Sequence, residues 1–257
     1  MRILCLGDSI MQYNDFSSYP QTGWVQELKR FFPEDWDFLN FARNGRSTKS
    51  FIDEGRFDLV MENAEKGDFA IIQFAHNDEK AADLTRFTSP ENGGAFRKNL
   101  AYFVRSLREK GVLPVLMTPM ARRMFENDHI KNSHGEYPDA IIETAAEENV
   151  PCIDMNALTM EFLEKTGDEA SKRFYMNFAP GLYQNYPDGK ADNSHLRSDG
   201  ANIFSKIAAE EIKKISASFP EYAELSENCM KNTGGRFLNV ENGENKEIDD
   251  EFMAFKK

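Results

Sequence analysis

The sequence predicts an α/β fold: three layers, α/β/α, built around a five-stranded parallel sheet. Short apolar runs typical of strands alternate five times with segments in which apolar residues recur at helical spacing. A chain of 257 residues is long enough to bury one such domain and short for two. This alternation places helices on both faces of a parallel sheet, so we expect right-handed crossovers and the flavodoxin-like strand order 2-1-3-4-5.

The expected strands are five short runs rich in apolar residues. They cover residues 2–6, 37–41, 69–74, 113–118 and 151–153. The expected helices lie around residues 24–32, 57–64, 96–110, 140–145 and 200–217. The third helix is the clearest, because its apolar residues keep a regular helical period and Gly111 follows as a C-terminal stop.

The chain changes character after about Phe219, which divides it into a domain over residues 1–219 and a polar appendage over residues 220–257. The appendage is rich in Glu, Asn, Lys and Gly, and its apolar patches are residues 237–240 and 252–255. We expect it to be a solvated tail, or a segment that packs back on the domain or on a partner subunit.

Composition excludes several classes of function. The net charge of −12 disfavours binding to nucleic acid or to anionic membranes, and no apolar run approaches the length of a membrane span. The start Met1-Arg2-Ile3 enters a strand almost at once, without an export signal, and the three cysteines form an odd set. We therefore expect a cytoplasmic protein; nothing in the sequence indicates its oligomeric state.

Polar, chemically capable residues follow several of the predicted strands at the point where each strand ends. Gly7-Asp8-Ser9 follows the first, Asn44-Gly-Arg-Ser-Thr48 the second and Ala75-His-Asn-Asp78 the third. Asp192-Asn-Ser-His195 lies in the long loop after the fifth strand, just ahead of the last helix. The carboxyl ends of parallel strands meet at one edge of a sheet, where ligands bind, so we expect these segments to converge.

These residue types are those of a serine hydrolase. Ser9 is the candidate nucleophile, His195 the candidate base, and Asp192, three residues before it, the candidate orienting acid. Two further residues, Gly45 through its backbone N–H and Asn77 through its side chain, are candidate oxyanion donors together with the Ser9 N–H. The structural alternatives are a helix cap at Ser9 and plain turns or loop caps at the other segments.

Other chemistries fit the sequence less well. A metal-dependent phosphoesterase would use ligands from Asp8, His76, Asp78, Asp192 and His195. It normally needs an Asp-x-His pair after the first strand, and this chain has Ile10 at the histidine position. No Gly-x-Ser-x-Gly pentapeptide, P-loop or dinucleotide fingerprint occurs. We therefore expect no metal and no cofactor.

In their order and approximate spacing, the four segments resemble the signature blocks of the SGNH hydrolases, also called GDSL esterases. Asn44-Gly-Arg-Ser-Thr-Lys-Ser-Phe51, Thr118-Pro-Met-Ala-Arg-Arg-Met-Phe125 and Tyr186-Pro-Asp-Gly-Lys-Ala-Asp-Asn-Ser-His195 are similar to the rhamnogalacturonan acetylesterase-like branch. The resemblance covers about residues 1–217. It implies the SGNH hydrolase fold and a catalytic triad of Ser9, His195 and Asp192. It also implies an oxyanion hole from Ser9, Gly45 and Asn77, and removal of O-acetyl groups from pectin-derived oligosaccharides.

The sequence departs from this family in two ways. The position two residues before Asn77, usually glycine, is Ala75, whose methyl group could tighten the loop. Members of this branch are commonly secreted, whereas we expect no export signal in this chain. We therefore expect imported oligosaccharide fragments as substrates in place of polymeric pectin. Two alternative functions stay open: a non-catalytic carbohydrate-binding module on the same fold, and a lipase or thioesterase acting on another acyl ester.

Positive charge gathers in loops at the expected active edge of this acidic protein. We expect these cations to favour a carboxylate-bearing sugar, although they could equally be ordinary solvated or structural residues. The candidate substrate contacts are Asp8, Arg46, His76, Arg122 and Arg123.

Overall fold

The computed structural model describes residues 1–241 and 244–247. Its main sheet has seven strands in the order β11-β10-β2-β1-β3-β4-β7. Five parallel neighbours are β2 (Asp37–Asn40), β1 (Arg2–Gly7), β3 (Phe69–Gln73), β4 (Leu113–Met117) and β7 (Cys152–Ile153). These are the predicted strands in the predicted order. The parallel α/β architecture expected from the sequence is therefore confirmed.

The sheet also contains two strands that the sequence did not predict, both from the polar C-terminal segment. β10 (Arg236–Glu241) pairs in parallel with β2, and β11 (Glu244–Glu247) pairs antiparallel with β10. Phe237 and Val240 of β10 are buried in the two opposite cores of the domain. The sheet therefore has six parallel strands and one antiparallel strand, and the expected count of five is corrected. The apolar patch expected at residues 252–255 lies outside the described residues.

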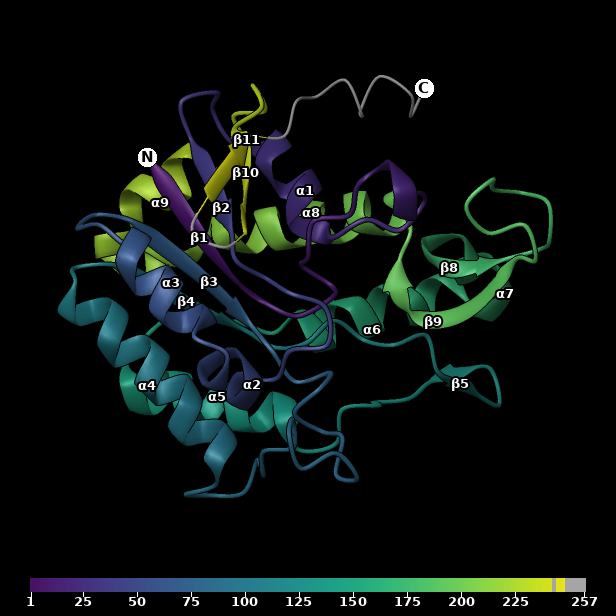
Figure 1. Cartoon of the computed structure of the whole chain (residues 1–257), viewed down its shortest axis with the longest axis horizontal. Coiled ribbons are helices and arrows are strands. Elements are labelled where there is room, and N and C mark those ends of the chain that lie inside the picture. The colour runs from purple at the N-terminus through teal and green to yellow at the C-terminus, as the bar shows by residue number, and fades with distance from the viewer. Residues whose placement is uncertain (242–243, 248–257) are drawn as a thin grey trace.

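Helices cover both faces of this sheet (Figure 1). One layer holds α2 (Thr48–Asp53), α3 (Arg56–Asn63), α4 (Ala95–Glu109) and α5 (Tyr137–Glu148). The other holds α1 (Trp24–Leu28), α6 (Met155–Thr166), α8 (Ser198–Ile212) and α9 (Ala223–Asn228). Shorter pieces are α7 (Asp168–Ser171) and the 3-10 turns η1 (Phe16–Ser18), η2 (Lys29–Phe31), η3 (Lys172–Phe174), η4 (Ile215–Ala217) and η5 (Pro220–Tyr222).

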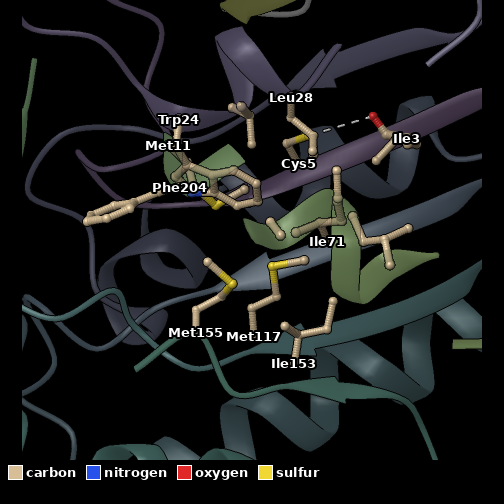
Figure 2. Packing of buried hydrophobic residues seen from close by; sticks show 14 of the residues in the cluster. Ile3, Cys5, Met11, Trp24, Leu28, Ile71, Met117, Ile153, Met155 and Phe204 are labelled. Atoms are coloured by element: carbon tan, nitrogen blue, oxygen red, sulfur yellow. Dashed lines mark hydrogen bonds between the residues drawn. The ribbon is translucent and has the colours of Figure 1, made fainter. Parts of the chain in front are cut away.

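Two separate cores fill the spaces between the layers, because side chains alternate across a strand. In β1, Ile3 and Cys5 face the core shared with α1 and α8, whereas Leu4 and Leu6 face the core shared with α2 to α5. Figure 2 shows the first core, in which the Cys5 thiol also donates to the Ile3 carbonyl at 3.9 Å. Its side chains come from strands, helices and the loop after β1: Ile71, Met117, Ile153, Trp24, Leu28, Phe204 and Met11.

Two hairpins stand to the side of the sheet in Figure 1: β5 (Phe125–Glu126) with β6 (His129–Ile130), and β8 (Tyr175–Phe178) with β9 (Lys190–Leu196). Asp192 and His195 were expected in a long loop, and the structure places them in β9 instead. Pairing with β8 gives this segment a fixed backbone just ahead of α8. Within the described part of the chain, no helix has the length and apolar character needed to cross a membrane.

Candidate active site

The four polar segments converge on one cavity of about 540 Å³ at the carboxyl ends of the parallel strands. Its wall is formed by the loops after β1, β2 and β3, by Arg122 after β4, and by β9. The lining residues are Ser9, Ile10, Asn44, Gly45, Arg46, His76, Asn77, Lys80, Arg86, Arg122, Ser194 and His195. Convergence at this edge was expected because each segment follows a predicted strand.

Ser9, His195 and Asp192 form one continuous hydrogen-bonded chain. The Nε2 atom of His195 lies 3.0 Å from Ser9 Oγ, and its Nδ1 atom lies 2.8 Å from Asp192 Oδ2. The other carboxylate oxygen, Asp192 Oδ1, accepts the backbone N–H groups of Ser194 at 2.9 Å and His195 at 3.0 Å. The aspartate thus closes a tight turn on itself, and this turn points the imidazole at Ser9.

The Asp192 carboxylate determines which tautomer the neutral His195 ring adopts. Partial burial acts to raise the pKa of Asp192, but hydrogen bonds and the charge of His195 hold that pKa well below its usual range. An ionised carboxylate can only accept, so Nδ1 of His195 carries a proton. In the neutral ring Nε2 is then the acceptor that faces the Ser9 hydroxyl.

Ser9 sits in a turn directly after β1. The Asp8 carbonyl accepts from the N–H groups of Met11 at 3.2 Å and Gln12 at 3.0 Å, and Asp8 Oδ1 accepts from the Ile10 N–H at 3.0 Å. Burial raises the pKa of Asp8 to about 6, against the effect of the Ile10 hydrogen bond. The structure does not place Asp8 on the cavity wall, where a substrate contact was expected. Its side chain shapes the turn instead.

Gly45 and Asn77 line the same cavity as Ser9. Gly45 has a φ of +78°, in the left-handed region that glycine adopts readily, and a side chain there would contact the Arg86 guanidinium. The Asn77 amide is held at both ends: its Nδ2 donates to the Arg46 carbonyl at 3.1 Å, and its Oδ1 accepts from Lys80 Nζ at 2.7 Å. The three residues expected to supply oxyanion donors, Ser9, Gly45 and Asn77, therefore line one cavity.

The loop that carries Asn77 contains a residue in an unfavourable conformation. Ala75 is fully buried and has a φ of +152°, in the region that favours glycine. Its carbonyl accepts from the Glu79 N–H at 3.1 Å and so closes the turn that contains His76 and Asn77. The departure from the family pattern noted in the sequence thus coincides with backbone strain, because a β-carbon is disfavoured at this φ.

Asp78 connects the segments that carry Gly45 and Asn77, a role that the sequence did not reveal. Its Oδ1 accepts from the Thr48 N–H at 2.9 Å, the Thr48 hydroxyl at 2.6 Å and the Thr88 hydroxyl at 2.7 Å. Thr48 is the first residue of α2, directly after the segment with Gly45. Burial raises the pKa of Asp78 to about 7, although the hydrogen bonds from the two threonines oppose this rise. The one sequence feature that could have indicated this role of Asp78 is its position directly after Asn77.

The three arginines expected to contact substrate, Arg46, Arg122 and Arg123, differ in where the structure places them. Arg46 lines the cavity and pairs with Glu54 at 2.7 Å, and Arg122 lines it and pairs with Glu79. Arg123 is buried away from the cavity wall, so the structure does not bring this expected contact to the site. Its guanidinium donates to Asn193 Oδ1 at 2.8 Å, Ser171 Oγ at 3.1 Å and the Asp168 carboxylate. Arg123 therefore fastens β9, between Asp192 and His195, to the body of the domain.

Two histidines pack against each other next to these cations, with perpendicular rings whose centroids are 4.6 Å apart. His134 is fully buried: its Nδ1 lies 3.0 Å from Glu79 Oε2 and its Nε2 lies 3.0 Å from the Met120 carbonyl. His76 lines the cavity, and its Nε2 has no hydrogen-bond partner within the described residues. Burial, reinforced by the neighbouring positive charges, holds the pKa of His76 well below its usual range. The Nε2 atom of a neutral His76 can therefore form a hydrogen bond with a bound molecule.

The possible metal ligands do not form a site. Across residues 1–241 and 244–247, no group of three or more His, Cys, Asp or Glu side chains is arranged to hold a metal ion. The phosphoesterase alternative, which needs ligands from Asp8, His76, Asp78, Asp192 and His195, therefore has no coordinating set in the described residues.

Comparison with known proteins gives one family and several relatives. The model of the GDSL-like lipase/acylhydrolase family matches residues 5–200. Rhamnogalacturonan acetylesterase RhgT of Bacillus subtilis is 38% identical over 223 residues, which cover 86% of this chain and 94% of that protein. A probable rhamnogalacturonan acetylesterase of the same organism, YesY, is 33% identical over 220 residues, covering 85% and 95% of the two chains.

Solved structures share the fold at lower identity. The YXIM protein of Bacillus subtilis superposes with a TM-score of 0.70 at 24% identity, covering 84% of this chain and 57% of that one. The acetylxylan esterase Axe2 of Geobacillus stearothermophilus superposes with a TM-score of 0.56 at 19% identity, covering 82% and 93%.

Proposed function

The chain belongs to the GDSL-like lipase/acylhydrolase family, and we propose that it removes O-acetyl groups from carbohydrate through an acyl-enzyme on Ser9. It is a carboxylic ester hydrolase. One observation carries the assignment of roles: the hydrogen-bonded chain Ser9–His195–Asp192 opens into the cavity that Gly45 and Asn77 also line.

Each residue has a defined task in this reaction. His195 Nε2 takes the Ser9 proton while Ser9 Oγ attacks the acetyl carbonyl carbon. The carbonyl oxygen becomes an oxyanion, which the N–H groups of Ser9, Gly45 and Asn77 stabilise. When this intermediate collapses, the C–O bond to the sugar breaks, and the sugar oxygen receives the proton from His195. Water, deprotonated by His195, then attacks the acetyl-enzyme. As the C–O bond to Ser9 breaks, His195 donates this proton to Ser9 Oγ, which releases acetate and restores free Ser9.

The cavity wall supports a short acyl group on a polar substrate. Ile10 is the one apolar side chain among its described lining residues, and a lipase would need a larger apolar surface for a long acyl chain. Relatives RhgT and YesY are named as rhamnogalacturonan acetylesterases, which supports pectin-derived oligosaccharides as the substrate class. We assign Arg46, His76 and Arg122 as the contacts to the sugar. The three free cysteines fit a reducing compartment, where imported fragments would be the substrates.

The test combines covalent labelling with the Ser9→Ala variant. A serine-directed fluorophosphonate should label the wild type and the surface control Ser218→Ala, and should not label Ser9→Ala. The esterase rate of Ser9→Ala should fall on the order of 10⁴-fold or more, because the nucleophile is absent. If Ser9→Ala keeps a tenth of the activity, the triad is wrongly assigned.

A substrate panel tests the rest of the proposal. Acetylated rhamnogalacturonan oligosaccharides should give a higher kcat/KM than acetylated xylo-oligosaccharides or long-chain acyl esters. Preference for a long-chain ester would favour the lipase or thioesterase alternative. Sugar binding without labelling or hydrolysis by the wild type would identify a non-catalytic binding module.

A further inference from the structure

We propose that Lys80 is a positioning residue of the oxyanion hole, which orients and polarises the side-chain amide of Asn77. This inference rests on the proposed function and deepens it. The observation behind it is the 2.7 Å hydrogen bond from Lys80 Nζ to Asn77 Oδ1 at the wall of the cavity.

The two partners of Asn77 fix which way its amide faces. An ammonium group can only donate, so the atom facing Lys80 must be the amide oxygen. A backbone carbonyl can only accept, so the atom facing the Arg46 carbonyl, 3.1 Å away, must be the amide nitrogen. Exchange of the two atoms would break both bonds. One N–H of Asn77 is thereby used by Arg46, and the other is left for a ligand in the cavity.

Local backbone geometry brings the lysine to this position. After β3 the chain makes a single turn, in which the Glu79 N–H donates to the Ala75 carbonyl at 3.1 Å and the Lys80 N–H donates to the Asn77 carbonyl at 3.3 Å. A turn of this pitch places residues three apart on the same side. The lysine therefore reaches the amide of its own turn without help from another element.

The charge of Lys80 is also the one most available to Asn77. The other cations on the cavity wall have carboxylate partners: Arg46 with Glu54, Arg86 with Asp83 and Arg122 with Glu79. Among the described residues, Lys80 has no carboxylate within 4.0 Å, and Asn77 Oδ1 accepts its hydrogen bond. A charge-assisted bond to the amide oxygen draws electron density from the nitrogen, which makes the remaining N–H a stronger donor.

This arrangement predicts a defect that appears mainly in the transition state. Removal of a whole oxyanion donor costs about 10²–10³-fold in kcat. Removal of the group that only orients and polarises the donor should cost less, about tenfold in kcat with little change in KM. The loss of kcat on removal of Lys80 should therefore occur only when Asn77 is present.

The experiment is a double-mutant cycle on a neutral aryl acetate, which has no carboxylate for Lys80 to bind. The variants are Lys80→Met, Asn77→Ala and the double variant, with Lys80→Arg as the conservative rescue and Lys206→Met as an exposed lysine on α8 for control. We expect Lys80→Met to lose about tenfold in kcat in the wild-type background and less than about twofold in the Asn77→Ala background. Lys80→Arg should recover most of the rate, and Lys206→Met should match the wild type.

Two outcomes would overturn the inference. One is wild-type kcat in Lys80→Met; the other is a loss of equal size with and without Asn77, which would mean that Lys80 acts on substrate directly. The ¹⁵N and ¹H resonances of the Asn77 side-chain amide give a readout without catalysis, since they should shift in Lys80→Met and return in Lys80→Arg. A wild type that neither hydrolyses acetyl esters nor labels at Ser9 would refute the proposed function, and the amide resonances would still test the contact.

Discussion

Replacement of Ala75 by glycine removes one methyl group from the turn that carries Asn77. The φ of Ala75 is +152°, where a β-carbon is unfavourable, and such conformations cost on the order of 1–3 kcal/mol. Glycine would relieve this strain. Two effects oppose the gain: loss of a buried methyl, about 0.8 kcal/mol, and the larger backbone entropy of glycine in the unfolded chain, about 0.5–1 kcal/mol.

The strain at Ala75 is best measured by comparison with a second buried alanine. Replacing that alanine by glycine should cause only the two unfavourable effects, without any relief of strain. Ala70 lies in β3 and is fully buried, as Ala75 is, but its backbone is extended. Ala70→Gly should therefore lower the free energy of unfolding by about 1.5 kcal/mol. Ala75→Gly should be close to neutral, so the two variants should differ by about 1–3 kcal/mol in favour of Ala75→Gly.

Urea denaturation of both variants, followed by circular dichroism, gives these free energies from the midpoint and the slope. The slope should match the wild type in each case, so that a change in midpoint reports a change in stability. If Ala75→Gly is destabilised as much as Ala70→Gly, Ala75 stores no strain, and the reasoning from its backbone angle is wrong.

Two further predictions concern the carboxylates of Asp192 and Asp78. Asp192→Asn should lower kcat on an aryl acetate by roughly 10²–10⁴-fold with an unchanged circular dichroism spectrum, because an amide no longer fixes the proton on Nδ1 of His195; near-wild-type kcat would contradict this. The pKa of Asp78 is raised to about 7 in the folded state, so between about pH 4 and 7 the folded chain keeps a proton that the unfolded chain releases. As pH rises from 4 to 8, the wild type should therefore lose stability relative to Asp78→Asn, on the order of a few kcal/mol. Urea denaturation of both proteins across this pH range measures the difference. A difference that stays constant with pH would mean that the pKa of Asp78 is not raised.

The sequence by itself determined the parts of the site that depend on local order. Gly7-Asp8-Ser9 had to lie at the sheet edge because it follows a parallel strand directly, and the same holds for Asn77 after β3. The contact between Asp192 and His195 was equally predictable, since they are three positions apart and the aspartate can accept the backbone N–H of its own turn. Strand order followed from alternation, because helical crossovers leave few arrangements of parallel strands.

Only the tertiary structure decided which side chains meet across long separations. Arg122 and Arg123 are neighbours in sequence, yet Arg122 reaches the cavity beside Glu79 while Arg123 is buried against Asp168 and Asn193. The sequence also did not show that Arg236–Glu241 adds a strand beside β2. A long cation can pair with any carboxylate that the fold brings within reach, and a short strand of mixed polar and apolar residues has only a weak periodic pattern. In both cases the partner supplied by packing sets the outcome, because it removes the side chain or the strand edge from water.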